Sequence, residues 1–445
     1  KTIIKKISIN SKNIKKNDIF FAIKGQRNDG NKFVGEAFKK NSSLAIVNKI
    51  NNNYPLFKQI KVKNTLNFLT KCSSNYRENI DAKIISITGS CGKTTLKEMM
   101  GLILKKISRI TISPKSFNNR YGVPLSLFNL KQNDEFGVFE IGMDKKGEID
   151  HLTKITKPNL GVITNISYAH SKNFKNIGQI ASAKAEIMNN IKKGGSIVLN
   201  KDDNFYVYHK KFALKKKLKV ISFGIKSKSS MIKLIKAKKI KNKYDLLISI
   251  NGQRFSFYSR NDNKSHLYNI LATLASINFF INIKKLKKDT FLNFKTPNGR
   301  GDISKIKLGN KNFFLVDETY NSNPLSLRTA IENYDKIESK NSKKYLILGD
   351  MLELGKHSNK QHQLISKDIN KTKINKVYVI GKYIKQTFKG LKPNKKAKIL
   401  NNKFDIIDVI NKNLNNNDYL MIKGSNSTGL KKITSILKQR NLHAI

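Results

Sequence analysis

Runs of consecutive apolar residues recur through the middle of the chain and alternate with segments of helical periodicity. Four runs follow one another, KIISIT (83–88), FGVFEIG (136–142), NLGVITNI (159–166) and GGSIVLN (194–200). A helical pattern over 94–104 comes after the first of them. Continuous apolar strands that alternate with helices are typical of a parallel sheet covered on both faces. The pattern predicts a central parallel-sheet domain over residues 82–296.

Two more segments of mixed strand and helix pattern flank this central one. The short runs DIFFAI (18–23) and SSLAIVN (42–48) predict a small N-terminal α/β domain over residues 1–81. A second alternating series predicts a C-terminal Rossmann-like α/β domain over residues 297–445, with strands NFFLVDE (312–318), KYLILGD (344–350), KVYVIG (376–381) and DYLMIKG (418–424). The polar segment TPNGRGD (296–302) marks the boundary. Three domains suit a chain of 445 residues, which is too long for a single hydrophobic core.

Two local patterns refine the central domain. In LLISINGQRFSFYS (246–259), two alternating strands flank Asn251-Gly252, which is the strongest short signal for a hairpin and predicts an antiparallel annex. The longest apolar stretch, Leu267 to Ile283, is interrupted by three asparagines, whose amides are costly to place in a bilayer. We expect this stretch to form a buried helix of a soluble protein.

The formal net charge of +57 raises the question of a polyanionic partner. Nearly all of the excess is lysine spread along the whole chain together with abundant asparagine and isoleucine, as an AT-rich coding sequence produces. A nucleic-acid-binding protein more often clusters its charge and uses arginine. We therefore favour background composition and expect no nucleic-acid partner, although a basic nucleic-acid-binding NTPase stays open as an alternative.

The cysteine content and the first residues bear on location. Two cysteines, Cys72 and Cys91, cannot form a disulfide framework, which fits a reducing compartment. The sequence starts at Lys1 without a charged-then-apolar leader. We expect a cytoplasmic protein whose true N-terminus lies before Lys1.

The segment TGSCGKTT (88–95) joins the first central strand to the following helix and carries the clearest chemistry. A glycine turn at a helix N-terminus presents unpaired backbone N–H groups to an anion. Lys93 would neutralise β- and γ-phosphate oxygens, and the Thr94 hydroxyl would ligate Mg²⁺. Ile87 stands where the common phosphate loop has its first glycine, so this loop is shorter. The predicted ATP phosphate site comprises Gly89, Ser90, Cys91, Gly92, Lys93, Thr94 and Thr95.

Two polar residues at the ends of apolar strands are candidate metal ligands. Glu140 ends FGVFE, where its carboxylate would emerge at the edge of the sheet that binds ligands. A salt-bridged glutamate without a metal is the alternative. His170 follows the strand in GVITNISYAH and could bind a second ion through a ring nitrogen, but an ordinary polar histidine explains the pattern equally well.

Taken together, these motifs resemble the Mur ligases, the family that adds amino acids to the cell-wall precursor. TGSCGKTT, FEIG (139–142), NISYAH (165–170) and ASAKAEI (181–187) follow in the family's order. VDETYNSNPLSLRTAI (316–331) and ILGDMLELG (347–355), followed by His362, resemble the signatures of the branch that adds D-alanyl-D-alanine. The N-terminal segment 10–33 is similar to the family's nucleotide-sugar domain.

The resemblance implies the reaction: ATP-dependent ligation of D-alanyl-D-alanine to UDP-N-acetylmuramoyl-tripeptide through an acyl phosphate, in peptidoglycan synthesis. It implies ATP and Mg²⁺ as cofactors, a monomer in the bacterial cytoplasm and no insertion into a membrane. It also implies that the first domain is truncated at its start. Another ligase of the superfamily, which adds a single amino acid or a glutamate to folate, is the nearest rival. Lys93, His170 and Lys184 are the implied catalytic residues. Lys184 is implied to be carbamylated by CO₂, and a carbamate would give a carboxylate-like oxygen donor.

The remaining implied roles concern ligands. The implied metal ligands are Thr94, Glu140, His170 and Lys184. The implied contacts to the rest of ATP are Asn269 at adenine, with Arg300, Asp317 and Asn321 from the C-terminal domain. The implied contacts to the UDP-sugar are Ser11, Lys24 and Asp29. The chain departs from the family pattern at Asn10, Lys12, Asn31, Glu318, Asn426 and in NKSH (263–266), which concerns substrate contacts more than the ATP and metal core.

Overall fold

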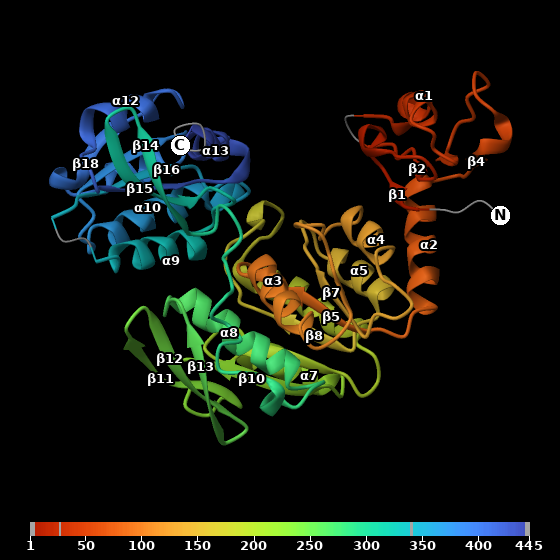
Figure 1. The fold of residues 1–445 in the computed structure, drawn as a ribbon, viewed down its shortest axis with the longest axis horizontal. Helices are drawn as coiled ribbons and strands as arrows, with labels where there is room; N and C mark the ends of the chain where they lie inside the picture. Colours follow the sequence, from red (N-terminus) through yellow and green to blue (C-terminus); the bar gives the residue numbers. More distant parts are fainter. Residues whose placement is uncertain (1–4, 26–27, 339–340, 441–445) are drawn as a thin grey trace.

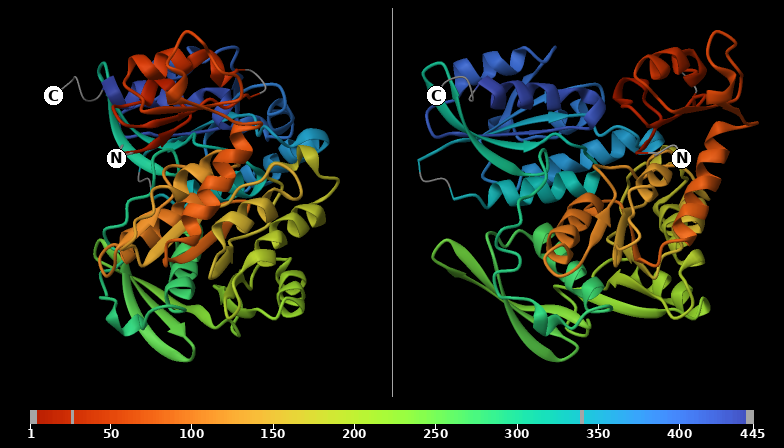
Figure 2. Two further views of the ribbon diagram at one scale, coloured as in Figure 1. Left: turned by 90° about the vertical axis from the view of Figure 1, so that its right-hand side faces the viewer. Right: turned by 45° about the vertical axis from the view of Figure 1, so that its right-hand side comes forward.

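The computed structural model describes residues 5–25, 28–338 and 341–440 of the chain. Three sheets with their own helices follow one another along the sequence, and we call them the first, central and third units (Figure 1). The first and third units lie on the same side of the central unit (Figure 2). The predicted α/β class, with a central parallel sheet, an antiparallel annex and a Rossmann-like third sheet, is confirmed. The domain boundaries at 81/82 and 296/297 remain predictions.

The first unit contains a small parallel sheet in the order β1-β2-β3-β4. Its strands are Ile7–Ser8, Ile19–Phe21, Leu44–Val47 and Gln59–Lys61. Its helices are α1 (Val34–Lys39) and α2 (Thr65–Glu78), with short 3₁₀ turns at Ser11–Asn13, Gly30–Phe33 and Leu56–Lys58. The runs at 18–23 and 42–48 that predicted strands form β2 and β3.

Helix α2 connects the first unit to the central one (Figure 1). At its start, Asn64 accepts a hydrogen bond from the backbone N–H of Asn67 and caps the helix. At its other end, the guanidinium of Arg77 is 2% exposed and donates to the carbonyls of Thr156, Ile80 and Ala82 at 3.1, 2.6 and 3.1 Å. The C-terminal end of α2 is therefore fixed to the central unit.

Within the described residues, the central sheet has nine strands in the order β13-β12-β11-β10-β9-β8-β5-β7-β6. The parallel part comprises β5 (Lys83–Thr88), β6 (Ile110–Ile112), β7 (Phe136–Glu140), β8 (Leu160–Ile163), β9 (Ser196–Asn200) and β10 (Lys219–Gly224). The four apolar runs thus all form parallel strands, and their carboxyl ends share one edge of the sheet, where ligands bind in open α/β folds.

Helices cover both faces of the central sheet because its strands are apolar on both sides. Ile85 and Ile87 pack with α3 (Lys93–Leu104) and α8 (Lys264–Ile277), whereas Ile84 points to the opposite core. That opposite core contains α4 (Gly122–Leu127), α5 (Glu148–Thr156), α6 (Ile177–Ala185) and α7 (Tyr206–Lys215). Short 3₁₀ turns lie at Ser171–Asn173, Glu186–Asn190 and Ile283–Lys285. The buried helix predicted from 267–283 is α8.

The antiparallel annex is continuous with the central sheet. Strands β12 (Lys243–Ile250) and β13 (Gln253–Ser259) form the predicted hairpin, and Asn251 and Gly252 both have positive φ, as this tight turn requires. A third strand, β11 (Ile232–Ile240), pairs with β12 and joins the annex to β10. Its sequence IKLIKAKKI is rich in lysine, and for this reason the apolar pattern did not predict it.

The third unit has its sheet in the order β14-β15-β19-β16-β17-β18. Its strands are β14 (Asp302–Leu308), β15 (Lys311–Glu318), β16 (Lys344–Gly349), β17 (Lys376–Ile380), β18 (Lys396–Ile399) and β19 (Tyr419–Lys423). Only β14, at the edge, runs antiparallel to its neighbour among these described strands. The carboxyl ends of β15, β19 and β16 face the central unit through the loops described below.

Helices cover both faces of the third sheet. One core packs against α9 (Pro324–Asp335), α10 (Ser358–Ile369) and α11 (Lys385–Lys389), and the other packs against α12 (Asp405–Asn413) and α13 (Leu430–Arg440). Short 3₁₀ turns lie at Gly355–His357, Pro393–Lys395 and Asn426–Thr428. Among the described residues, no helix combines the length and apolar character needed to cross a bilayer.

Candidate active site

The loop between β5 and α3 has a backbone that suits close approach of a ligand. Gly89 and Gly92 adopt φ of +144° and +85°, a region that side chains rarely occupy. A Cβ atom at Gly89 would lie 1.8 Å from the Thr164 hydroxyl oxygen, so no other residue fits there. Gly92 caps α3 without a side chain, and the first N–H groups of the helix are left to face the cavity.

A hydroxyl and a carboxylate meet directly beside this loop. The Thr94 hydroxyl donates to Glu140 Oε2 at 2.6 Å, and the Asn118 amide donates to Glu140 Oε1 at 2.7 Å. Glu140 ends β7 and is only 2% exposed. The Lys93 ammonium donates to the Gly89 carbonyl at 2.7 Å, so it is folded over the loop. Oxygen donors and an ammonium thus converge where the parallel strands end.

The segment that leads into the third unit reaches the same hydroxyl. Arg300 Nη2 donates to Thr94 Oγ1 at 2.9 Å, and its guanidinium carbon lies 3.8 Å from the centre of the Tyr320 ring. The Tyr320 hydroxyl hydrogen-bonds Ser116, which also lies 3.4 Å from Thr94 Oγ1. The ring holds the guanidinium by a cation–π contact. The arginine is therefore positioned over the phosphate loop.

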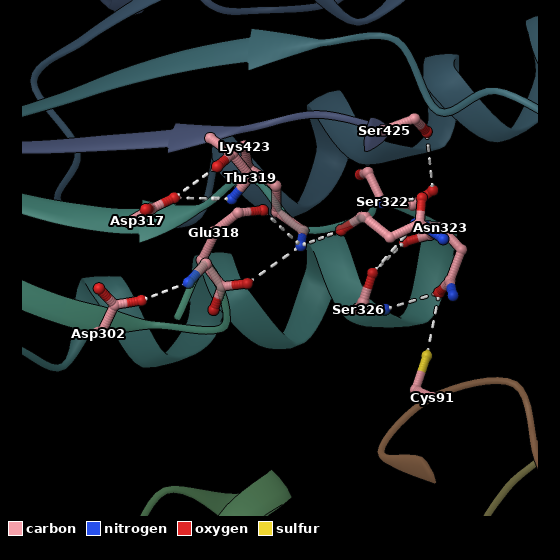
Figure 3. A network of polar contacts seen from close by, with 12 residues as sticks. Cys91, Asp302, Asp317, Glu318, Thr319, Ser322, Asn323, Ser326, Lys423 and Ser425 are labelled. Atoms are coloured by element: carbon pink, nitrogen blue, oxygen red, sulfur yellow. Dashed lines mark hydrogen bonds and ion pairs between the residues drawn. The ribbon is translucent and has the colours of Figure 1, made fainter. Parts of the chain in front are cut away.

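The loop after β15 contacts the phosphate loop as well (Figure 3). The Cys91 thiol donates to Asn323 Oδ1 at 3.1 Å, and burial raises the pKa of this thiol, which keeps it neutral. Lys423, 1% exposed, lies 3.1 Å from Glu318 Oε2 and donates to the Asn321 carbonyl at 3.0 Å. This buried lysine on β19 fixes the loop that meets Cys91.

A cavity of about 1010 Å³ connects these groups. The phosphate loop and Glu140 form one wall, Asn269 and His266 of α8 form another, and Arg300 and residues of the third unit close it. A Cβ atom added at Gly92 would lie 3.2 Å from Asn269 Oδ1, so the Asn269 side chain adjoins the phosphate loop. The volume suits a nucleotide and part of a second substrate.

His170 lies at a second contact between the units. Its Nδ1 is 2.7 Å from Glu353 Oε2 of the third unit and 3.2 Å from Asp144 Oδ1 of the central unit. Burial opposes protonation, but these two carboxylates raise the pKa of the ring overall. His170 also lines the cavity.

Lys184 is a buried amine near the phosphate loop. Its side chain, at the end of α6, is 1% exposed. Burial, together with the positive charge of Lys93, holds the pKa of its amine well below the usual range. A neutral amine is nucleophilic, whereas an ammonium is not.

Comparisons with known proteins agree with this geometry. Family models match two parts of the chain, the Mur ligase middle domain over residues 87–277 and the Mur ligase, glutamate ligase domain over residues 306–426. The UDP-N-acetylmuramoyl-tripeptide--D-alanyl-D-alanine ligase of Rickettsia prowazekii is 32% identical over 96% of this chain and 94% of its own length. The chain belongs to the Mur ligase family. It is an ATP-dependent ligase that forms amide bonds.

Two more similarities cover the same span. The enzyme of the same name from Buchnera aphidicola (subsp. Acyrthosiphon pisum) is 32% identical over 98% of this chain and 93% of its own. The crystal structure of MurF from Acinetobacter baumannii matches with a TM-score of 0.86 and 25% identity, over 98% of this chain and 94% of that one. The likeness to Mur ligases therefore includes all three units, not the phosphate loop alone.

In this Mur ligase, most of the ATP and metal residues predicted from the sequence gather at one cavity. The residues that line it are Ser90, Cys91, Gly92, Lys93, Thr94, Thr95, Glu140, His170, Asn269, Arg300 and Asn321. Gly89 lies beneath the loop against Thr164, and Lys184 is buried behind it. Their roles in binding and catalysis remain predictions.

Four predicted residues stand apart from this cavity in the part of the chain that the structure describes. Asp317 accepts from Lys438 and Thr319, both at 2.6 Å, and it points to the far side of β15. Ser11, Lys24 and Asp29 belong to the first unit. There, Ser11 donates to Glu36 at 2.7 Å, and Asp29 accepts from the Asn31 backbone at 3.0 Å.

Several residues of the site were not predicted from the sequence. Asn165 Oδ1 accepts from the Cys91 backbone at 3.0 Å, and its place directly after an apolar strand was an available signal. Asn118 carried no signal of its own, because its contact depends on a partner distant in the sequence. Glu353 lies in the signature segment ILGDMLELG, but its contact with His170 was not predicted. His266 lines the cavity, and burial lowers the pKa of its ring to about 4.

Proposed function

We propose that this Mur ligase joins D-alanyl-D-alanine to UDP-N-acetylmuramoyl-tripeptide, with hydrolysis of ATP to ADP and phosphate. The printed names of relatives that match over nearly the whole chain support this substrate pair. The observation that carries the proposal is the convergence of Lys93, Thr94, Glu140 and Arg300 at one cavity formed by two units. That arrangement suits transfer of a phosphoryl group to a second substrate.

The phosphate loop would hold ATP. The free N–H groups at the start of α3 would receive phosphate oxygens, and the Lys93 ammonium would move from the Gly89 carbonyl to the β- and γ-phosphates. Asn269 would contact adenine, since it adjoins the loop on α8. Arg300 would add positive charge on the side of the third unit.

The donor set fits magnesium. A hydroxyl oxygen and a carboxylate oxygen 2.6 Å apart face the cavity at Thr94 and Glu140, and Mg²⁺ takes such hard oxygen ligands together with phosphates and water. Among the described residues, no group of three His, Cys, Asp or Glu side chains could hold a metal alone, so the nucleotide would complete the site. The bound ion supplies charge neutralisation at the transferring phosphoryl group.

His170 and a carbamate on Lys184 would hold a second ion. The lowered pKa of Lys184 supports carbamylation, because the neutral amine attacks CO₂ and loses one proton to form a carbamate. This change replaces a buried neutral amine with an anion, and the attraction between that anion and the nearby Lys93 ammonium would offset the cost of burying its charge.

The chemistry proceeds in two displacements. The terminal carboxylate of the tripeptide attacks the γ-phosphoryl group and ADP leaves, which gives an acyl phosphate. The amino group of D-alanyl-D-alanine then attacks the acyl carbon, loses a proton and expels phosphate. Lys93 and Arg300 stabilise negative charge on the transferring group, and docking of the third unit excludes water that would hydrolyse the acyl phosphate.

The first and third units would each bind one of the two substrates. Ser11, Lys24 and Asp29 in the first unit would contact the UDP-sugar, and the third unit would deliver the dipeptide. Asp317, bound to Lys438, would act from behind β15 by fixing Thr319 at the start of the loop that carries Asn321, rather than by touching ATP. The product would be used for peptidoglycan, with consequences for cell shape and division, and the reaction would take place in the bacterial cytoplasm.

The test uses the full chain with ATP, Mg²⁺, UDP-N-acetylmuramoyl-tripeptide and D-alanyl-D-alanine, and detects the pentapeptide product by mass spectrometry. Lys93→Ala should abolish the product, and Lys105→Ala, an exposed lysine at the end of the same helix, should not. A product formed with single amino acids, or ATP hydrolysis that depends on DNA or RNA, would contradict the proposal.

A further inference from the structure

Helix α7 has one face in the core of the central unit and one face exposed to solvent. On the inner face, Ala213 and His209 are buried, and His209 Nε2 lies 3.0 Å from the Ala181 carbonyl oxygen. On the outer face, the aliphatic side chains of Val207 and Leu214 are 61% and 58% exposed. Seven residues, or two turns, separate them, so they lie on the same side of the helix and form an apolar strip.

Lysines flank this apolar strip. Residues 206–219 contain no aspartate or glutamate, and six of them are exposed lysines: Lys210, Lys211, Lys215, Lys216, Lys217 and Lys219. Among the residues that the structure describes, none of these six ammonium groups belongs to an ion pair. Residues 206–219, which we call the α7 surface, thus combine exposed aliphatic side chains with unpaired positive charge.

We propose that the α7 surface docks on bilayers of anionic phospholipid, with the helix lying flat in the interface. Helices with apolar side chains on one side and lysines around them bind in this way, because the apolar groups enter the acyl boundary while the ammonium groups meet lipid phosphates. Tyr208, exposed beside the strip, is of the residue type that lies at headgroup level. Docking of this kind requires no helix to cross the bilayer, and it is independent of the proposed function.

The charge and the apolar strip together favour this occupant over two others. A second copy of this chain would bring the same lysines against the α7 surface, and like charges repel. A nucleic acid would match the charge, but its phosphate backbone offers no apolar phase to Val207 and Leu214. An anionic bilayer matches both parts of the surface, because its phosphates lie directly above hydrocarbon.

The α7 surface lies apart from the candidate active site. Helix α7 packs on the face of the central sheet opposite to α3 and α8, and Figure 1 shows it in the lower part of the central unit, below the first and third units. Residues 206–219 do not line the cavity that contains the phosphate loop. Substrates can therefore reach that cavity while the α7 surface is occupied.

The test is flotation of the full chain with vesicles of phosphatidylcholine, with or without phosphatidylglycerol. We expect binding to the anionic vesicles and none to the neutral ones. One triple variant combines Lys210→Gln, Lys211→Gln and Lys215→Gln. It should weaken binding by about 100-fold, because each lysine at an anionic surface contributes about fivefold.

A matched control removes the same charge elsewhere. A second triple variant combines Lys360→Gln, Lys367→Gln and Lys371→Gln, at exposed positions of α10 and just after it, where the aliphatic side chains are buried or half-buried. We expect less than a threefold change in vesicle binding. The comparison separates docking through the α7 surface from attraction by the net charge of the whole chain.

The apolar strip is tested without any change of charge. Val207→Ser combined with Leu214→Ser should weaken vesicle binding at least tenfold, because a bilayer takes up apolar side chains. The chain contains no tryptophan, so Leu214→Trp introduces a single one. Its fluorescence should shift to the blue with anionic vesicles, whereas that of Gln363→Trp, at an exposed position of α10, should not.

Three results would overturn the proposal. They are an absence of binding to anionic vesicles, an equal loss of binding in the two triple variants, and binding to a DNA duplex that the two serine substitutions leave unchanged while vesicles are not bound. Thermal melts verify that each variant folds. Ligase activity without vesicles should be the same in the parent and in the α7 variants, so failure of this proposal leaves the proposed function standing.

Discussion

Arg300 and Thr94 share a hydrogen bond of 2.9 Å although 206 positions separate them in the sequence. The Thr94 hydroxyl accepts a hydrogen bond from Arg300 and donates one to Glu140 Oε2 at 2.6 Å. A cation from the segment leading into the third unit, a hydroxyl of the phosphate loop and a buried carboxylate therefore form one chain of contacts. Chemistry at the phosphate loop should depend on where the third unit lies.

Replacement of Arg300 should affect the chemical step more than folding. We expect Arg300→Ala to lower kcat by about 10²–10³-fold, because a positioned cation at a transferring phosphoryl group contributes on that scale. Arg300→Lys should recover only part of the rate, since an ammonium lacks the planar stack on Tyr320. Initial rates of phosphate release measure the effect. Arg260→Ala, on an exposed central-unit arginine, serves as the control, and an equal loss there would refute the assignment.

Glu140→Gln should separate metal binding from stability. The amide keeps the size of the side chain but loses the charge that would attract Mg²⁺, so we expect activity to fall at least about 100-fold and to require more Mg²⁺. The melting temperature should stay the same or rise, because burial of a charge at 2% exposure is costly. A Mg²⁺ titration of the rate and a thermal melt test both parts. Glu135→Gln, exposed just before β7, should change neither.

Gly89→Ala should damage the phosphate loop by collision. The added Cβ would lie 1.8 Å from the Thr164 hydroxyl oxygen, so the loop or β8 must move. Gly194 is the matched control, since it also has positive φ but has open space around a Cβ. We expect Gly194→Ala to lower the free energy of unfolding by about 1 kcal/mol and Gly89→Ala to lower it by more, with loss of nucleotide binding. Urea unfolding and a fluorescent-nucleotide titration would show the difference, and equal effects would contradict it.

The Asp317–Lys438 ion pair should make stability depend on pH at both extremes. Burial alone would raise the pKa of Asp317, but hydrogen bonds from Lys438 and Thr319 lower it below the ordinary 3.8. Burial alone would lower the pKa of Lys438, but Asp302 and Asp317 raise it above the ordinary 10.5. The ion pair therefore contributes to the free energy of unfolding between about pH 3.8 and pH 10.5. This contribution is lost as the pH falls below about 3.8 or rises beyond about 10.5.

Lys438→Met tests this pH dependence. At pH 7 the variant should lose about 1–3 kcal/mol of unfolding free energy, the usual scale for a hydrogen-bonded charge. The difference from the parent should shrink at pH 3 and at pH 11, as urea unfolding at each pH would show. Lys432→Met, on an exposed position of the same helix, should have little effect at any pH. A loss that is constant with pH would mean that packing, not charge, is responsible.

The sequence pattern predicted those parts of the fold that are buried on both faces. The central and C-terminal strands with unbroken apolar runs all formed, and so did the hairpin at Asn251-Gly252. The missed strands are short, partly exposed or rich in lysine, so burial does not determine their sequences; they are β1, β4, β6, β10, β11, β14 and β18. Their positions depend on pairing with neighbours rather than on their own composition.

The candidate site could be predicted only where neighbouring residues form it. The phosphate loop and the strand-end Glu140 were found because strand, turn and helix follow one another. Asp317 and Glu318 show why adjacency in the sequence is not enough. Successive side chains of a strand point to opposite faces of the sheet, so of these two neighbours only Glu318 lines the cavity. The Cys91–Asn323 contact spans 232 positions, and no local pattern contains it.

Helix α2 is anchored in both of the units that it connects. At its end, the Arg77 guanidinium donates to three carbonyls of the central unit and of the segment beside it. At its start, the Thr65 hydroxyl donates to the Ala22 carbonyl at 3.1 Å, and Leu69 packs with Phe21 and Ile46 of the first sheet. The helix therefore acts as a splint, and the first unit should move together with the central unit rather than swivel on it.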